Sequence, residues 1–248
     1  MFLVYLIVGL ACGFIDSALG MGYGVSSVTI LLSFGIMPAI ASASIHTAEG
    51  FVDIVSGVSH WKFGNIDKEL LIKLTVPGIL GAILGAYALS LMSLSFAKPV
   101  VSSILLVMGL LILLRFAMKK NGVFKKIPSR LLSLLGFAAA FIDVCGGGGW
   151  GPILTPTLIF NGHEPRKAVG TVELTEPIIS FTAVIVFGLS FGFDAFLWQI
   201  VLPLIVGGFI LTPLAAYITK KIPKQLFGVL IGLWLTVLNL RTLLLSVL

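Results

Sequence analysis

Apolar residues along the chain gather in long blocks that short polar segments separate. A helix needs roughly 20 mostly apolar residues to cross a bilayer, and seven or eight of the blocks reach or approach that length. The blocks at 25–35 and 152–161 are too short to cross alone, and each follows a glycine cluster, so they predict half-helices. The blocks cover residues 2–19, 25–35, 39–60, 69–92, 97–118, 131–145, 152–161, 166–188, 195–219 and 225–247.

The composition makes the bilayer the solvent for most of this chain. Hydrophobic residues make up 58% of the 248 residues and charged residues 10%, whereas soluble globular proteins carry roughly 25% charged residues. The mean hydropathy is +1.14, and no soluble fold has enough interior to bury so much apolar surface. These values predict an all-α polytopic membrane protein, and they exclude a disordered chain or a disulfide scaffold.

The net charge of +6 indicates topology rather than nucleic-acid binding, because the basic residues sit in short loops and not on an aromatic-laced face. The segment 119–130 holds five of the 16 Lys and Arg residues and no acid, which marks it as cytoplasmic. If each half-helix returns to the side from which the preceding helix entered, Lys98 and Arg241 are the only basic residues expected outside. Both chain termini are then expected outside as well.

The sequence repeats itself when it is shifted by 127 residues. Segment 14–49 matches segment 141–176 at 11 of 36 ungapped positions, where chance would give roughly three. We therefore predict two membrane units, 1–118 and 131–248, joined by the linker 119–130. Each unit makes one excursion, a glycine-broken helix and a half-helix, plus three crossing helices. Three is odd, so the second unit is inverted, as in secondary transporters; duplication that only builds a stable bundle is the alternative.

The glycine clusters are the first candidates for a binding site. Four consecutive glycines at 146–149 break a helix, and non-helical backbone at membrane depth survives only beside protein or a water-filled cavity. The free N–H groups of the helix after each break attract anions, whereas close packing through small residues is the alternative. The predicted substrate-binding residues are Ser17, Gly20, Gly22, Gly24, Ser44, Cys145, Gly146, Gly147, Gly148, Gly149, Gly151 and Thr171.

Six of the ten acidic residues fall inside predicted spans. The spacing of His46, Glu49 and Asp53 puts them on one helix face, and Glu173 and Glu176 occupy the equivalent face of the second unit. A carboxyl group at that depth is least costly when it is protonated, which makes Glu49 and Glu176 candidate proton carriers. A neutral acid that cross-links two helices by a hydrogen bond is the alternative.

Two further acids, Asp16 and Asp143, come directly before the glycine clusters. They either carry protons or cap the broken loop, and His46 either carries protons or makes an ordinary hydrogen bond. No metal site and no cofactor are predicted. The predicted proton-coupling residues are Glu49, Glu176, His46, Glu173, Asp16 and Asp143.

These segments resemble the TauE/SafE family of anion permeases, the sulfite exporter family. The resemblance rests on the glycine-rich break at 146–152 with Pro156, on its partner at 20–24, and on the segments 38–44 and 165–171 that follow. The duplicated layout extends it over essentially the whole chain.

The resemblance implies a secondary transporter that exports a small sulfur oxyanion or organosulfonate, of the sulfite or sulfoacetate class, across a bacterial or archaeal inner membrane. The expected partners are the anion, protons and the lipid bilayer, not nucleic acid, and the oligomeric state stays open, a homodimer included. Coupling to protons and alternating access are expected, and a passive anion channel is the alternative. An intramembrane aspartyl protease needs an acid after the glycines, whereas the acids here precede them, so no enzyme is predicted.

Overall fold

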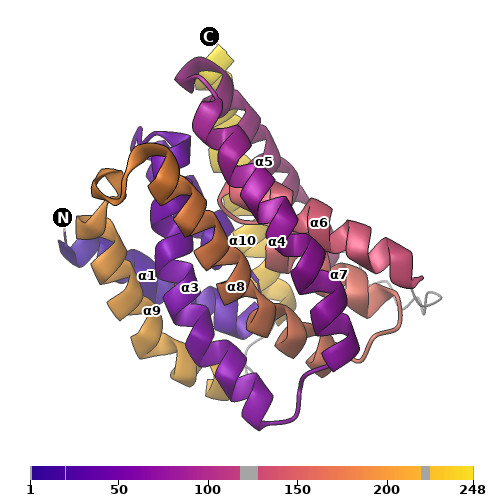
Figure 1. Ribbon diagram of the computed structural model, residues 1–248. Coiled ribbons are helices and arrows are strands. Elements are labelled where there is room, and N and C mark those ends of the chain that lie inside the picture. The colour runs from indigo at the N-terminus through magenta and orange to yellow at the C-terminus, as the bar shows by residue number, and fades with distance from the viewer. Residues whose placement is uncertain (1, 20, 118–127, 219–223, 248) are drawn as a thin grey trace.

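The computed structural model describes residues 2–19, 21–117, 128–218 and 224–247. Within these ranges the chain forms α-helices and one short 3-10 turn, η1 (Phe193–Ala195), and no strand (Figure 1). The first of the two predicted units contains α1 (Phe2–Leu19), α2 (Tyr23–Ser33), α3 (Pro38–Lys62), α4 (Lys68–Leu91) and α5 (Leu94–Ala117). The second contains α6 (Ser129–Gly146), α7 (Trp150–Phe160), α8 (Pro165–Phe191), α9 (Trp198–Ile218) and α10 (Lys224–Val247).

Large apolar side chains lie on the surface of the molecule, whereas several ionisable groups lie in its interior. Leu189 is 80% exposed and Leu134 is 62% exposed, whereas His46 is fully buried and Glu49 is 3% exposed. In the described chain, the segments Lys68–Leu91, Ser95–Ala117 and Lys167–Phe191 are helices long and apolar enough to cross a membrane. The protein is therefore a membrane-embedded, polytopic helical protein.

The two units meet at α3 and α8, which run antiparallel through the middle of the molecule (Figure 1). A Cβ atom added to Gly50 would lie 3.3 Å from Cβ of Ser180, and one added to Gly57 would lie 2.9 Å from Cα of Leu174. The contact thus moves backward along α8 as it moves forward along α3. Small residues at the contact let the two backbones approach closely.

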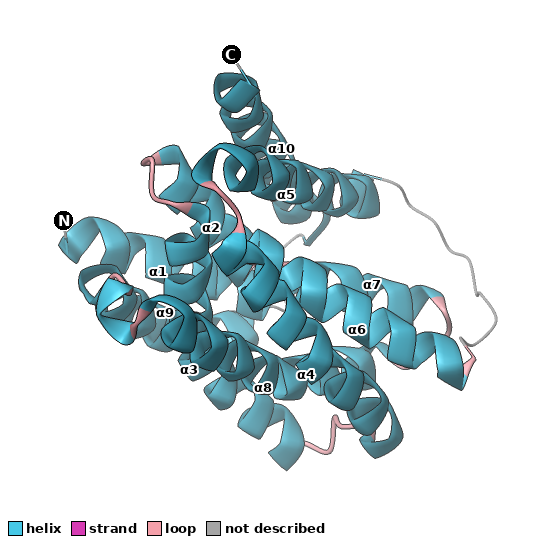
Figure 2. Ribbon diagram, turned by 45° about the horizontal axis from the view of Figure 1, so that its top comes forward, coloured by secondary structure: helices cyan, strands magenta, loops and turns pink. Residues whose placement is uncertain are grey.

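The pair α5 and α10 is also antiparallel and packs beside the other helices, as Figure 2 shows. A Cβ on Gly109 would lie 2.9 Å from the backbone nitrogen of Thr236, and one on Gly232 would lie 2.6 Å from Cα of Leu113. Both self-equivalent helix pairs of the 127-residue repeat are therefore antiparallel.

The remaining long helices pair across the units in parallel, α1 with α9 and α6 with α4. A Cβ on Gly9 of α1 would lie 2.8 Å from Cα of Leu204, and one on Gly136 of α6 would lie 3.0 Å from Cα of Leu74. Gly9 and Gly136 are repeat equivalents, 127 residues apart. Equivalent glycines thus pack on the repeat-equivalent helices α9 and α4, although not at equivalent residues of those helices.

The chain leaves the helix at both glycine clusters, and each following half-helix, α2 or α7, has 11 residues. The interruptions are narrower than the glycine runs, because Gly146 still ends α6 while Gly24 and Gly151 already belong to the half-helices. Gly22 has φ 118° and Gly147 has φ 73°, backbone conformations that other residues rarely adopt.

Candidate functional site

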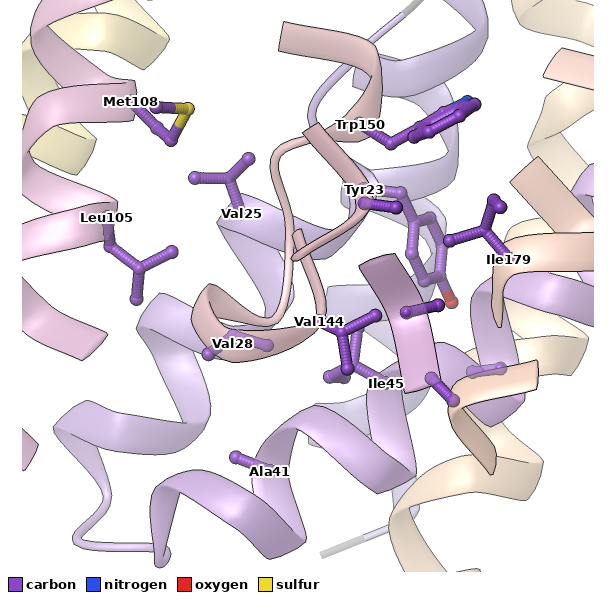
Figure 3. Close-up of a cluster of buried hydrophobic side chains, with 14 of the residues drawn as sticks. Tyr23, Val25, Val28, Ala41, Ile45, Leu105, Met108, Val144, Trp150 and Ile179 are labelled. Atoms are coloured by element: carbon purple, nitrogen blue, oxygen red, sulfur yellow. The ribbon is translucent and has the colours of Figure 1, made fainter. Parts of the chain in front are cut away.

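The two glycine breaks touch each other in the interior. A Cβ on Gly24 would lie 2.8 Å from the carbonyl oxygen of Gly147 and 2.9 Å from Cα of Gly148. Figure 3 shows Tyr23 and Trp150, the first residues of the two half-helices, in one buried cluster with Val25, Val28 and Val144. The two clusters therefore meet in the described part of the chain, whereas Gly20 and the side chain of Ser17 lie outside it.

An aspartate closes each break in the same way. The backbone N–H of Tyr23 donates to Oδ1 of Asp16 at 3.2 Å, and that of Trp150 donates to Oδ1 of Asp143 at 3.1 Å. Donor and acceptor are seven residues apart in both cases. These carboxylates satisfy N–H groups that the start of a helix leaves without an intrahelical partner. Of the two roles considered for Asp16 and Asp143, the cap is therefore the one that the geometry displays.

Glu49 reaches the first break from a different helix. Its Oε1 accepts a hydrogen bond from the backbone N–H of Gly24 at 2.9 Å, across 25 residues of sequence. Its other oxygen, Oε2, is buried without a hydrogen-bond partner in the described structure. An acid of α3 thus occupies the N-terminal end of α2, where a helix attracts anions.

His46 and Asp143 join the two units by a buried pair. Nε2 of His46 lies 3.2 Å from Oδ2 of Asp143, and Nδ1 lies 2.8 Å from the backbone oxygen of Ser42. The hydroxyl of Ser42 in turn donates to the backbone oxygen of Val144 at 2.7 Å. A doubly protonated imidazole would satisfy both of its acceptors, so this pair is suited to a charged histidine beside an ionised aspartate.

Five acids converge between α1, α3 and α8. Oxygens of Asp16, Asp53 and Glu173 lie within 4.8 Å of one another, as do oxygens of Glu49, Asp53 and Glu176. All five side chains are buried. Carboxyl groups this close can all be ionised only with a hard, oxygen-binding cation between them; otherwise some of them must be protonated.

Three residues predicted to bind substrate make hydrogen bonds elsewhere. The hydroxyl of Ser44 accepts from the backbone N–H of Leu197 at 3.1 Å, and that of Thr171 accepts from the N–H of Asp67 at 3.0 Å. These contacts tie the α8–α9 and α3–α4 connections to the opposite unit. The thiol of Cys145 donates to the backbone oxygen of Gly85 at 3.4 Å. A role in binding stays a prediction for all three.

Sequence comparison places this architecture in a known family. Residues 5–242 match the family described as "Sulfite exporter TauE/SafE". The chain belongs to the TauE/SafE family. This TauE/SafE protein is similar to the "Probable membrane transporter protein YtnM" of Bacillus subtilis (strain 168), with 45% identity over 246 residues, 97% of this chain and 82% of that protein. No solved structure matches it. It is a membrane transporter and not an enzyme.

One residue of this TauE/SafE protein belongs to the acid cluster although it was not among the predicted site residues. Asp53 contributes to both sets of three acids, and neither of its oxygens has a hydrogen-bond partner in the described structure. Its place on the helix face of His46 and Glu49 was the available signal. The helical period shows which side chains share one face of α3, but not which helix packs against that face. The sequence alone therefore could not show that Asp53 belongs to both sets of acids.

Proposed function

We propose that this protein is a proton-coupled secondary transporter that exports a small sulfur oxyanion or organosulfonate by alternating access. The observation that carries the proposal is the convergence of buried carboxyl groups on two glycine breaks, with Glu49 bonded to Gly24 at 2.9 Å. An anion can enter a core this acidic only when some of the acids are protonated. Movement of the anion and of protons is then linked.

The inverted repeat is part of this proposal. The antiparallel packing of the repeat-equivalent helices α3 and α8, and of α5 and α10, supports it, as does the packing of Gly9 on α9 and of Gly136 on α4. In such repeats the substrate site lies between the units near the middle of the bilayer. The breaks at Gly24 and Gly148 are at that boundary and touch, so anion passage requires the two units to separate there.

The family description, sulfite exporter, supports the proposed substrate class and the direction of transport. Two half-helices whose N-terminal ends face the interior provide positive potential for an anion. The proposal includes the cell membrane of a bacterium or archaeon with both termini outside, which the family and the distribution of basic residues support. The linker 119–130 that anchors this topology lies for the most part outside the described residues. The proposal does not depend on whether the protein is a homodimer.

Reconstituted vesicles test the proposal. We expect sulfite or sulfoacetate to accumulate against its concentration gradient when a pH gradient is imposed, in sodium-free buffer that contains a chelator. Vesicles without protein are the control. Only downhill flux would establish the passive channel instead, and accumulation that requires sodium or a divalent cation would assign the acid cluster to a metal ion rather than to protons.

A further inference from the structure

We propose that one oxygen of the transported anion binds at the N-terminal end of α2, and that the carboxylate of Glu49 holds this seat when no substrate is bound. Substrate and ionised Glu49 then exclude each other, so that anion binding requires protonation of Glu49. The inference rests on the proposed function, because it names the anion site and the coupling residue of that transporter.

The carboxylate of Glu49, which accepts the hydrogen bond at this site, can move away from it. Asp16 caps α2 from the last turn of α1, and Asp143 caps α7 in the same way from the last turn of α6. Both carboxylates therefore belong to the fold of the breaks. Glu49 has a different origin, because it comes from α3 and bonds the N–H of Gly24 at 2.9 Å. A change in the distance between α3 and α2 would break this bond and leave the cap of Asp16 intact.

A second polar group points to the same place. Ser26 lies in the first turn of α2, is fully buried, and its hydroxyl has no hydrogen-bond partner in the described structure. The hydroxyl is directed back toward the break, because a Cβ added to Gly22 would lie 4.0 Å from it. Other buried hydroxyls, such as those of Thr29 and Thr47, donate to the backbone oxygen four residues earlier. Ser26 thus keeps a donor available at the helix start, which suits an oxyanion.

Gly24 is closely surrounded, and its N–H already has an acceptor in Glu49. The position of a Cβ on this residue would have Oε1 of Glu49 at 2.9 Å, the oxygen of Gly147 at 2.8 Å and Cα of Gly148 at 2.9 Å around it. An incoming oxyanion must therefore take the place of the carboxylate, which is itself an oxyanion of similar oxygen spacing. When Glu49 is protonated it loses its charge and accepts from the N–H less strongly. The net charge at the seat then stays the same after the exchange.

Other ionisable groups also act on Glu49, so its proton is shared with a network. Within the described chain these groups are Asp53 and His46 on α3, Asp16 and Cys12 on α1, Tyr23 on α2, Asp143 on α6 and Glu176 on α8. Most are acids, and their charge opposes both an ionised Glu49 and a bound anion. Glu49 is the group among these whose carboxylate bonds the N–H of Gly24, so it is the one that the incoming anion displaces and that takes up the proton.

Binding measurements on the purified full-length protein test this inference. The probe is sulfoacetate, whose sulfonate stays ionised throughout. For the wild type we expect the Kd to rise up to tenfold per pH unit between about pH 6 and pH 8, because one proton is taken up with each anion. For Glu49→Gln we expect a Kd that varies little with pH and is at least about tenfold lower than that of the wild type at about pH 8.

A matched serine pair tests the seat itself. Ser26→Ala should weaken sulfoacetate binding severalfold at every pH without changing the pH dependence. Ser102→Ala is the control, because Ser102 on α5 is equally buried and its hydroxyl also has no partner in the described structure. Equal loss of affinity in both variants would overturn the assignment of Ser26.

The proton uptake can be measured without any variant, by calorimetric titration of the wild type in two buffers of different ionisation enthalpy. Sulfoacetate binding with no proton uptake would overturn the inference and leave the transporter proposal standing. Weaker binding by Glu49→Gln at about pH 8, or an unchanged pH dependence, would also overturn it. A wild type that binds and transports neither sulfoacetate nor sulfite would remove the proposed function together with the inference.

Discussion

His46 and Asp143 are 97 positions apart in the sequence and lie 3.2 Å apart in the interior, where they are 0% and 1% exposed. The repeat places Glu173 at the position equivalent to His46 and Asp16 at the position equivalent to Asp143. That second pair also meets, in the set of Asp16, Asp53 and Glu173. One of these two equivalent pairs therefore joins an imidazole to a carboxylate, whereas the other joins two carboxyl groups.

We expect the His46–Asp143 pair to be a main contributor to stability. His46→Leu should lower stability by about 3–5 kcal/mol, because it leaves a buried charge without its partner. Thermal unfolding in detergent measures the effect as a fall in apparent Tm. The double variant His46→Leu with Asp143→Asn should recover part of the loss, since the amide oxygen that replaces the carboxylate can still accept from the N–H of Trp150. An unchanged Tm in the single variant would show that the pair is not ionised.

We expect Gly24→Ala to force the two breaks apart. The new Cβ would meet the oxygen of Gly147 at 2.8 Å and Cα of Gly148 at 2.9 Å, which is closer than real contacts allow. Overpacking of this kind costs about 1–3 kcal/mol. Gly149→Ala is the control, because its backbone is extended at φ 170° and its nearest contact would be 3.3 Å. Equal Tm values for the two variants would argue against the close contact of the breaks.

Glu176→Gln tests proton coupling apart from substrate binding. Gln cannot exchange a proton, and Glu176 lies in the set with Glu49 and Asp53, so accumulation driven by a pH gradient should be abolished while expression is kept. Vesicle uptake measures this. Glu69→Gln is the control, because Glu69 is exposed on α4 and pairs with Lys73. Accumulation at the wild-type level by Glu176→Gln would exclude the residue from proton transfer.

Asp53→Asn should stabilise the protein and impair its coupling. Both oxygens of Asp53 are buried without a hydrogen-bond partner in the part of the chain described, and four other acids surround them. An amide removes one charge and supplies donors for Oε2 of Glu49, which we expect to raise stability by about 1–3 kcal/mol. A higher apparent Tm together with lost pH-driven uptake is the expected result. A lower Tm would contradict the assignment, because it would show that the carboxylate is already stabilised.

Much of the fold could be read along the chain because it depends on local composition. Apolar blocks of span length, glycine runs that interrupt them and a 127-residue repeat predict the helices, the two breaks and the half-helices. The capping position of Asp16 and Asp143 also follows from local spacing, since each acid lies seven residues before the residue whose N–H donates to it. These features involve neighbours in sequence, so periodicity and propensity are enough to place them.

The pairs of residues that touch although they are far apart in the sequence came only from the tertiary structure. A helical period shows that His46, Glu49 and Asp53 share a face, but not that His46 meets Asp143 or that Glu49 bonds Gly24. The packing of α3 against α8 brings Asp53 between two sets of acids, and the tie of Ser44 to Leu197 depends on the same packing. The sequence by itself determined where helices run and break. Which buried groups touch was decided by how two units pack, because long-range contacts leave no trace in local spacing.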